Sequence, residues 1–413
     1  MYLDINNLYG WAMMQYLPLC NFKWCYLNID QIINNPDDSS EGFILEVDLE
    51  YPESLHNHHS DYPMCPEHRI PPESNSKNKK LLLTLYNKNN YVLHYRTLKQ
   101  ALEQGLILKK VHKILKFNQS PWLKPYIDLN TRERTLAKND FDKNLFKKMS
   151  NSIYGKTMEN VRLRLDVKLK SSYDGRYGVK TLIAQPNFKK SIILNENLVA
   201  IEMLRTEILM NKPIIIGSSI LEISKVKMYD FHYNYMKNKF NDNVRLHYTD
   251  TDSFMYSVEC EDFYEVMKED CHMFDTSDYD ENNIYKIQLL NKKKPGIMKD
   301  ENNGTCITEF VGLRSKMYSY RLNKCENSKT IKKAKGIKNY VMKKNINFDD
   351  YIKCIKENCE IGKFQNSIRS KLHNVFTVSQ YKIALSPFDD KRKVLENNTE
   401  TLPWGHYKLN NKN

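Results

Sequence analysis

Hydrophobic residues are spaced in two regular ways along this chain, and each spacing predicts a different element. Short apolar runs at residues 1–5, 43–49 and 81–85 have the length and composition of β-strands. Residues 245–257 alternate apolar and polar side chains on both sides of an acidic turn, which predicts a β-hairpin. Prolines and small polar residues dominate the segment 54–80, so we expect an irregular loop there.

Two longer segments have a helical pattern. In the first, which begins near residue 131, apolar residues recur about every fourth position and form one helix face; they are Leu136, Phe141, Leu145, Met149 and Ile153. The second helix is expected to begin after Ser218, a residue type that caps helix N-termini. Its apolar stripe consists of Ile220, Ile223, Val226, Tyr229, Tyr233 and Met236. We find no internal repeat in the sequence.

Composition and charge narrow the class of protein. A chain of 413 residues is long enough for about two or three domains, and a hydrophobic content of 41% supports packed cores. Lysine and arginine number 63 against 50 acidic residues, which gives a net charge of +13. This excess favours a polyanionic partner such as nucleic acid, although a Lys-rich and Asn-rich codon bias explains it equally well.

The cysteines and the hydropathy argue against a disulfide-bonded protein and against a membrane protein. The nine cysteines include no Cys-x-x-Cys pair, so we expect reduced thiols in an intracellular protein. Cys65 and His68 supply at most half of a zinc site. No stretch approaches the roughly 18 apolar residues of a membrane span, and no signal segment is visible. We therefore expect a soluble protein without a membrane partner, and the sequence leaves its compartment, nucleus or elsewhere in a host cell, open.

The acidic turn of the predicted hairpin is the first candidate for chemistry. Asp250 and Asp252 are separated by one residue, so on a strand both carboxylates would point to one face. Adjacent carboxylates repel each other unless a hard cation such as Mg²⁺ neutralises them. An acidic turn without a function is the alternative, because Asp-x-Asp is frequent by chance.

Two further clusters are weak when taken singly. Asp4 ends a short apolar strand and Tyr9 follows it, but a tyrosine near a turn usually serves packing. In the first predicted helix, four polar residues share one face: Asn139, Lys143, Lys147 and Asn151. Lysines and amides in a row suit an anionic ligand such as a triphosphate. A solvated helix face is the commoner meaning of such spacing.

In this order, the three clusters resemble the polymerase motifs of family B DNA polymerases. The first motif, Asp-x-x-Ser-Leu-Tyr-Pro, is matched at Asp4, Leu8 and Tyr9, whereas Asn7 replaces the serine and Gly10 replaces the proline. The second motif, Lys-x-x-x-Asn-Ser-x-Tyr-Gly, is matched in full by Lys147, Asn151, Ser152, Tyr154 and Gly155.

The third motif, Tyr-x-Asp-Thr-Asp, is matched in full by Tyr248, Asp250, Thr251 and Asp252. A Lys-x-Tyr element follows as Lys316-Met317-Tyr318. The chain is most similar to the protein-primed branch, which includes adenovirus-like and bacteriophage polymerases, Maverick-type transposons and related insect viruses.

The resemblance implies an α+β fold, a right-hand polymerase with an antiparallel-sheet palm, helical fingers, inserted subdomains and a small thumb, without an exonuclease domain. Because the family carries an exonuclease before the first motif, we expect a chain truncated at its N-terminus, in which nothing preceding the strand of Asp4 pairs with it.

The resemblance also divides the chain into six expected parts. The expected divisions are 1–12, the first palm strand with the first motif; 13–120, a terminal-protein-region-like insertion and the palm remainder; 121–160, fingers with the second motif; 161–195, a second insertion; 196–325, palm with the third motif and Lys-x-Tyr; and 326–413, thumb and tail.

The resemblance also implies roles for individual residues in a DNA-templated DNA polymerase. Asp4, Asp250 and Asp252 would hold two catalytic Mg²⁺ ions, with Mn²⁺ as a substitute. The nucleotide-binding residues would be Asn7, Leu8, Tyr9, Arg134, Lys143, Lys147, Asn151 and Tyr154. The residues at the DNA would be Gly155, Tyr248, Thr251, Lys316 and Tyr318. The implied partners are primer-template DNA, dNTPs and, as an additional candidate, a terminal protein primer.

Some assignments keep alternatives. Helix phase favours Arg132 over Arg134 as the additional fingers cation if the segment is one continuous helix, but a break into two helices is the alternative. Family spacing favours Arg134. Lys292 to Lys294 and the lysines of 332–344 suit non-specific contacts to DNA phosphates.

Two other functions compete with a DNA polymerase. A reverse transcriptase or RNA polymerase usually has two adjacent aspartates in the third motif, unlike Asp250-Thr251-Asp252, and Tyr9 resembles a steric gate against ribonucleotides. A decayed, non-catalytic DNA-binding remnant is favoured by the truncated start and disfavoured by the intact aspartates and Lys147.

Overall fold

The computed structural model describes residues 1–74, 77–323, 329–372 and 374–410. At its centre lies a five-stranded sheet with the strand order β11-β12-β1-β14-β13. The middle strand, β1 (Tyr2–Ile5), is antiparallel to β12 (Ser253–Val258) on one side and to β14 (Met298–Asp300) on the other. The strand predicted at residues 1–5 is thus confirmed, and downstream strands cover both of its edges.

The outer strands of this sheet complete the frame of the third motif. β11 (Val244–Asp250) pairs with β12 as an antiparallel hairpin, which confirms the hairpin predicted for residues 245–257. On the opposite edge, β13 (Phe274–Asp275) runs parallel to β14. The connections between β12 and β13 include α9 (Phe263–Glu269) and η5 (Cys271–Met273).

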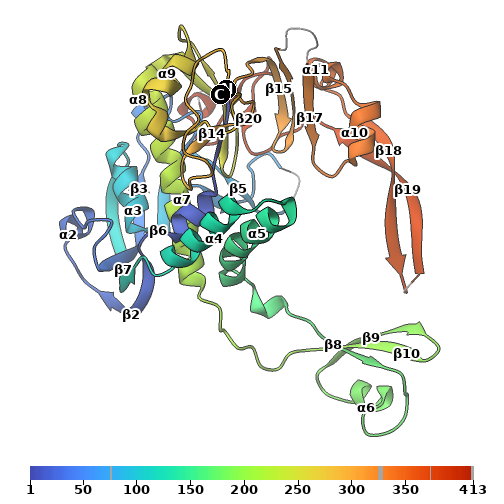
Figure 1. Ribbon diagram of the computed structural model, residues 1–413. Helices are drawn as coiled ribbons and strands as arrows, with labels where there is room; N and C mark the ends of the chain where they lie inside the picture. The colour runs from blue at the N-terminus through green and yellow to red at the C-terminus, as the bar shows by residue number, and fades with distance from the viewer. Residues whose placement is uncertain (75–76, 324–328, 373, 411–413) are drawn as a thin grey trace.

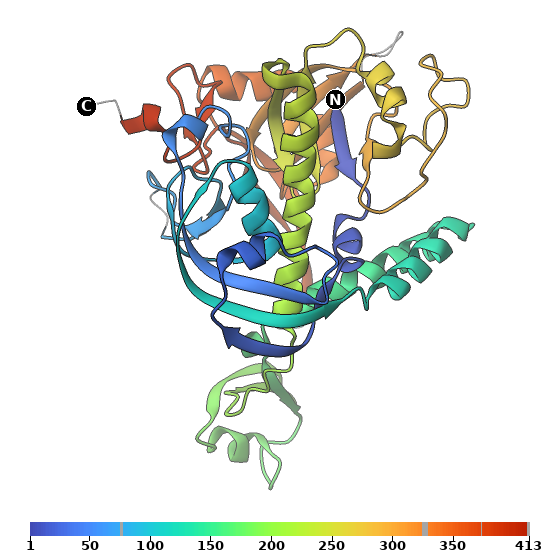
Figure 2. The same cartoon turned by 90° about the vertical axis from the view of Figure 1, so that its left-hand side faces the viewer.

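A long helix lies against this sheet and connects it with the rest of the molecule (Figure 2). The helix α7 (Ile214–Tyr229) continues as the π-helical segment η3 (Asp230–Lys237), followed by α8 (Asn238–Phe240) and η4 (Asn241–Asn243). It begins after Pro213, so the predicted cap Ser218 lies inside the helix. The predicted stripe is confirmed, because every member except the half-buried Val226 is buried: Ile220, Ile223, Tyr229, Tyr233 and Met236.

A four-stranded sheet with the order β2-β7-β3-β6 occupies the other side of α7. Its strands are β2 (Leu17–Cys25), β3 (Glu41–Glu50), β6 (Lys88–His94) and β7 (Ile107–Ser120). β3 confirms the strand predicted at 43–49. Two helices accompany this sheet, α2 (Ile29–Ile33) and α3 (Tyr95–Glu103).

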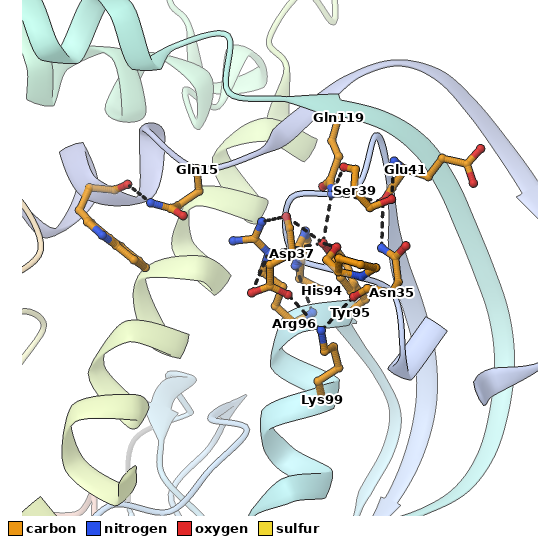
Figure 3. Close-up of polar contacts among 12 residues, drawn as sticks. Gln15, Asn35, Asp37, Ser39, Glu41, His94, Tyr95, Arg96, Lys99 and Gln119 are labelled. Atoms are coloured by element: carbon orange, nitrogen blue, oxygen red, sulfur yellow. Dashed lines mark hydrogen bonds and ion pairs between the residues drawn. The ribbon is translucent and has the colours of Figure 1, made fainter. Parts of the chain in front are cut away.

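A polar network fixes the turn before β3 to α3 and β7 (Figure 3). The Arg96 and Lys99 side chains of α3 form ion pairs with Asp37 at N···O distances of 3.6 and 3.1 Å. The Gln119 amide of β7 donates to the carbonyl groups of Ser39 and Glu41 at 2.9 and 3.2 Å. These bonds satisfy buried polar groups and therefore hold the sheet and helix in one arrangement.

The segment 54–80 is mostly irregular, as predicted. It contains η1 (Glu53–Leu55) at its start and β4 (Glu67–Arg69), which pairs with β5 (Lys80–Leu82). The strand predicted at 81–85 is therefore only partly formed, because β5 ends at Leu82.

Two antiparallel helices, α4 (Lys124–Leu136) and α5 (Asp140–Thr157), project from the body (Figure 2). The chain thus forms two helices, an alternative that the sequence left open, and the single apolar face expected across the segment was wrong. The chain breaks between them, where the Asn139 side chain accepts the Asp142 N–H at 2.8 Å and caps α5. The break changes the helix phase, so Leu136 and Phe141 are 65% and 76% exposed. Asn139 is likewise a cap and does not belong to the lysine face.

Three smaller units complete the chain. A separate sheet with the order β8-β10-β9 projects from the body beyond α5 (Figure 1) and is built from η2 (Val161–Leu163), β8 (Asp166–Lys170), α6 (Val179–Ile183), β9 (Phe188–Asn195) and β10 (Leu198–Met203). The next sheet contains β15 (Ile307–Arg314), β16 (Met317–Leu322) and β17 (Lys329–Ala334).

The last unit follows β17. It comprises α10 (Asn339–Asn345), α11 (Phe348–Lys356), the projecting hairpin of β18 (Ile361–Lys371) and β19 (Asn374–Leu385), β20 (Lys393–Val394), β21 (Thr401–Leu402) and α12 (Tyr407–Asn410) (Figure 1). The eight cysteines in the described part of the chain are free thiols. None of the described helices has the length and apolar character needed to cross a membrane.

Two buried histidines make the core sensitive to acid. Nδ1 of His59 lies 2.7 Å from the Tyr51 hydroxyl, and Nδ1 of His232 lies 2.9 Å from the Tyr256 hydroxyl. Both side chains are fully buried, and burial lowers the pKa of each imidazole to about 3. The folded protein therefore keeps these groups neutral at a pH where the unfolded chain protonates them.

We predict that the free energy of unfolding decreases as the pH falls below about 6.5, the ordinary histidine pKa, by up to about 1.4 kcal/mol per pH unit for each such group. His59→Gln cannot titrate and should show a shallower dependence than wild type in urea unfolding between pH 6.5 and 5. His272→Gln, at an exposed histidine, should keep the wild-type slope. An unchanged slope for the His59 variant would contradict the prediction.

Candidate active site

The central sheet brings the first and third motifs together. Asp4 lies on β1 directly opposite Ser253 of β12, and the Ile5 N–H donates to the Asp252 carbonyl oxygen at 2.7 Å. Burial and then the charge of Asp252 raise the pKa of the Asp4 carboxyl to about 7, with a smaller contribution from Glu301. The pKa of Asp252 is also raised, mainly by burial and then by Asp250. These two half-buried carboxylates therefore repel each other.

The second motif reaches the same place through α5. The charge of Lys147 opposes the rise in pKa of both Asp4 and Asp252, so its ammonium group lies within electrostatic reach of the two carboxylates. Residues from three distant segments thus form one charged cluster. The ammonium group of Lys147 is suited to bind a negatively charged ligand at this cluster.

Asp250 is oriented differently from the sequence-based expectation. Thr251 and Asp252 form the two-residue turn between β11 and β12, so Asp250 and Asp252 do not lie on one strand and the same-face argument was wrong. Thr251 has a φ of 47°, which is uncommon for a β-branched residue. The Asp250 carboxylate forms an ion pair with Lys316 at 3.2 Å.

The carboxylates fit a divalent cation by their chemistry. Two partly desolvated carboxylates, of which Asp252 raises the pKa of Asp4, would be relieved by a hard, oxygen-preferring ion. Within the described ranges, no group of three or more His, Cys, Asp or Glu side chains is already arranged around a common metal position. Asp4 and Asp252 therefore form the core of the candidate site, and Asp250 would join them only after leaving Lys316.

Tyr9 connects the first and second motifs. It lies on α1 (Leu8–Met13) and its ring stacks on Tyr154 of α5, with centroids 4.3 Å apart and planes inclined by 12°. Asn7 precedes α1 with a φ of 46°, and its side chain folds over Gly10, where an added Cβ would lie 2.0 Å from Asn7 Nδ2. This contact explains a glycine where the motif has a proline. Leu8 is buried, so only its backbone is available to a ligand.

Cations of α4 and α5 lie within electrostatic reach of the loop between β13 and β14. Arg132 is 66% exposed and pairs with Glu133, whereas the half-buried guanidinium of Arg134 has a pKa lowered by burial. Burial lowers the pKa of Lys293, and the charges of Arg134, Lys292 and Lys143 lower it further. This arrangement favours Arg134 over Arg132 as the additional cation.

The other second-motif residues lie on the accessible part of α5. Asn151 and Gly155 are exposed, and a Cβ added to Gly155 would meet no atom within 4 Å. A glycine inside a helix costs about 1 kcal/mol relative to alanine, and no packing here requires it. Its position therefore suggests space kept for a ligand.

The Lys-x-Tyr element lies beside the third motif. The Lys316 N–H donates to the Tyr248 hydroxyl at 3.2 Å, in addition to the ion pair with Asp250. Tyr318 is only 5% exposed, its ring packs on Tyr248 with centroids 4.7 Å apart, and its hydroxyl lies 3.5 Å from that of Tyr2. Tyr318 thus supports Tyr248 and Tyr2 more than it faces solvent.

Sequence reasoning missed Asp275, Asn6 and Lys299. Asp275 is 2% exposed and accepts the Asn6 side-chain amide at 2.6 Å, which fixes the turn after Asp4. Lys299 lies opposite Asp4 on β14 and pairs with Asp278 at 2.5 Å. A single aspartate, a single asparagine and an isolated lysine give no sequence signal.

Comparison with solved structures shows the same fold. Phi29 DNA polymerase complexed with primer-template DNA and incoming nucleotide substrates matches with a TM-score of 0.56 and 17% sequence identity, over 93% of this chain and 57% of that chain. The orthorhombic crystal form of Phi29 DNA polymerase matches with a TM-score of 0.55 and 18% identity, over 93% and 58% of the two chains. The chain thus spans less than two thirds of the Phi29 polymerase chain. The likeness supports the α+β right-hand polymerase architecture expected from the sequence.

Comparison with protein families identifies the chain. No curated protein matches it. The family model described as DNA polymerase type B, organellar and viral, matches residues 1–238, which is more than half of the sequence and includes the first and second motifs. Together with the arrangement of the three motifs around Asp4 and Asp252, this match shows that the chain belongs to the organellar and viral type B DNA polymerases.

Proposed function

We propose that this chain is a DNA-templated DNA polymerase that extends a primer in the replication of a viral or transposon DNA. In the reaction, the primer 3′-oxygen forms a bond to the α-phosphorus of a dNTP, the bond from that phosphorus to the pyrophosphate breaks, and the hydroxyl proton is released. The observation that carries the proposal is the convergence of Asp4, Asp252 and Lys147 from three segments of the chain.

The carboxylates would hold the metal ions. Asp4 and Asp252 would be the main ligands, and Asp250 would be the third ligand once Lys316 turned to another anion. Two bound Mg²⁺ ions, or Mn²⁺ in their place, would lower the pKa of the 3′-hydroxyl and neutralise charge on the triphosphate. The electrostatic repulsion between the Asp4 and Asp252 carboxylates supports this role, because a bound cation would remove it.

The basic side chains of the fingers would bind the triphosphate. Lys147 lies within electrostatic reach of the carboxylates, and Lys143 and Arg134 lie further along the same pair of helices. Fixed cations at the phosphates stabilise the negative charge that develops on the leaving pyrophosphate. Backbone at Asn7 and Leu8 would complete the site on the palm side.

The aromatic pair would select the sugar. Tyr9 stacked on Tyr154 forms a rigid floor within electrostatic reach of Asp252, and a 2′-hydroxyl would collide with such a ring. Asn151 and Tyr154 would line the nascent base pair, and the open space at Gly155 would admit the template strand. These roles depend on the first and second motifs lying next to each other.

The residues around the third-motif turn would hold the primer end. Thr251 is exposed at the tip of the hairpin, and Tyr248 is fixed by Tyr318 and by the Lys316 N–H. Lys316 would exchange Asp250 for a primer phosphate. We propose primer-template DNA and dNTPs as partners, with a terminal protein as an additional primer, because the chain is similar to protein-primed polymerases.

We predict that Asp252→Ala reduces primer extension in Mg²⁺ by at least about a thousandfold, because a ligand that stabilises transition-state charge contributes several kcal/mol. Single-nucleotide insertion on a primed template measures the effect, and thermal unfolding verifies that the variant folds. Asp38→Ala, at an exposed aspartate far from the turn, should extend at the wild-type rate. A wild-type chain that binds DNA but never extends the primer would instead support the non-catalytic remnant.

We predict that Tyr9→Ala raises the ratio of NTP to dNTP insertion by about tenfold or more, because loss of the ring corresponds to at least about 1.4 kcal/mol of discrimination. The ratio of kcat/KM values for the two nucleotides measures it. Tyr9→Phe retains the ring and should retain selectivity, and Tyr26→Ala, at a fully exposed tyrosine, provides the matched control. Equal selectivity of the Ala and Phe variants would refute the steric role.

We predict that Asp4→Asn stabilises the metal-free protein at pH 8. Because the pKa of Asp4 is about 7 in the folded state, the folded protein keeps this carboxyl protonated at pH values where the unfolded chain, with the ordinary aspartate pKa, has lost the proton. The free energy of unfolding therefore falls as the pH rises from the ordinary pKa to about 7. In EDTA, the Asn variant should therefore unfold several degrees above wild type at pH 8 and show a smaller difference at pH 5. Asp38→Asn should show no such pH dependence. A lower Tm of the Asp4 variant at pH 8 would contradict the assignment.

A further inference from the structure

The loop between β13 and β14 is bound to the turn that follows Asp4. The Gly296 N–H donates to the Asn6 carbonyl oxygen at 2.8 Å, and the Asn6 N–H donates to the Ile297 carbonyl oxygen at 3.0 Å. At its other end, the Asn291 side-chain amide donates to the carbonyl groups of Cys271 and Phe274, each at 2.9 Å. The loop is thus fixed at both ends, and it carries Lys292, Lys293 and Lys294 between them.

Asp275 fastens the middle of this loop to the same turn. Its Oδ2 atom accepts both the Asn6 side-chain amide at 2.6 Å and the Lys293 N–H at 2.8 Å, and its Oδ1 atom accepts the Ser277 N–H at 3.0 Å. This buried carboxylate is satisfied entirely by N–H groups. It therefore acts as a clamp that couples the backbone of Lys293 to the residue two positions after Asp4.

The conformation of Lys293 is unusual for a lysine. Its φ is 55°, in the left-handed region that residues with a side chain rarely adopt. Such a conformation persists only where the surroundings determine it, and the Asp275 clamp supplies that constraint. Lys293 is half-buried, whereas Lys292 and Lys294 are exposed. The clamp therefore directs one particular lysine of the run inward.

The groups around Lys293 are mostly cations. Arg134 of α4 and Lys143 of α5 lie within electrostatic reach from the fingers side, and Lys292 from its own loop. The acidic group that faces it, Asp278, is already paired with Lys299. Among the described residues, neither Lys293 nor Arg134 forms an ion pair with a carboxylate. Cations from three elements repel each other unless an anion lies between them.

We propose that Lys293 binds the phosphates of the incoming nucleotide and completes, with Arg134 and Lys143, a triphosphate site that spans palm and fingers. This inference rests on the proposed polymerase function and deepens it. The clamp through Asn6 would keep the lysine in register with Asp4, so that one rigid turn positions both a carboxylate and a cation for the same substrate.

A DNA backbone phosphate has the same chemistry as a nucleotide phosphate, and the position of the cluster decides between them. Lys143 lies one helical turn before Lys147 on α5, and Lys147 lies within electrostatic reach of Asp4 and Asp252. The anion that Lys293 meets is therefore expected next to the reacting centre and between palm and fingers. This place suits a triphosphate better than the duplex.

The test compares Lys293→Ala with Lys294→Ala, which changes an exposed lysine of the same loop. We expect Lys293→Ala to raise the KM for dNTP in single-nucleotide insertion by about tenfold, as for the loss of one charge-assisted hydrogen bond to a phosphate, with little change in the Kd for primer-template DNA. Lys293→Arg should restore most of the affinity, and Lys294→Ala should leave the KM unchanged. Inhibition by inorganic pyrophosphate should weaken in Lys293→Ala alone.

A second measurement does not require turnover. Retention of a DNA complex in gels with Ca²⁺ and increasing dATP reports nucleotide binding, and Lys293→Ala should require more dATP than Lys294→Ala. Because Asp275 binds the backbone of residue 293, the substitution leaves the clamp in place, and Lys293→Gln provides a second neutral variant whose folding is verified by thermal unfolding.

The inference is overturned if Lys293→Ala retains the wild-type KM and dATP dependence, or if it weakens DNA binding instead, which would assign the lysine to the DNA backbone. Equal effects of the Lys293 and Lys294 variants would also overturn it. Absence of extension by the wild-type chain would contradict the proposed polymerase function, whereas a defect of Lys293→Ala confined to nucleotide affinity in an active enzyme would support the site inferred here.

Discussion

The pairing of β1 with β12 is the constraint on which the rest of the site depends. It places Asp4 beside Asp252, although their positions in the sequence are far apart, and it buries both carboxylates partly. The resulting repulsion between the carboxylates destabilises the folded protein and favours the binding of a cation. Stability and function are therefore opposed at this point of the sheet, as is common where charged groups of one sign are held together.

The sheet can tolerate this repulsion because its surroundings are well packed. Leu3 and Ile5, the neighbours of Asp4 on β1, are buried on the opposite face, where α7 and η3 supply a continuous apolar stripe. Burying such side chains contributes about 1.5–3 kcal/mol each, which offsets the unfavourable carboxylate pair. The alternation of β1 thus divides one short strand into a face for stability and a face for chemistry.

Much of this arrangement could be predicted from the sequence, because the signals were local. Alternation identified the β11–β12 hairpin, and the apolar stripe identified α7. The sequence left a break between two helices open but did not locate it, since a pattern repeating about every fourth residue passes through Asn139 without interruption. Similarly, the placement of Asp250 and Asp252 depended on where the turn begins, and a shift of one residue separates them.

The motifs of the candidate site were predicted from the sequence, but the hydrogen bonds that join its segments were not. Asp275, Asn6 and Lys293 belong to no periodic pattern, and their contacts join residues that are far apart in sequence. Only the folded chain shows that a buried carboxylate can bind the turn after Asp4 and a lysine loop at the same atom. Because that atom accepts both N–H groups, neither segment can move without the other. Asp275 thus couples the turn after Asp4 to the backbone of Lys293, and α4 and α5 supply Arg134 and Lys143, which lie within electrostatic reach of that lysine.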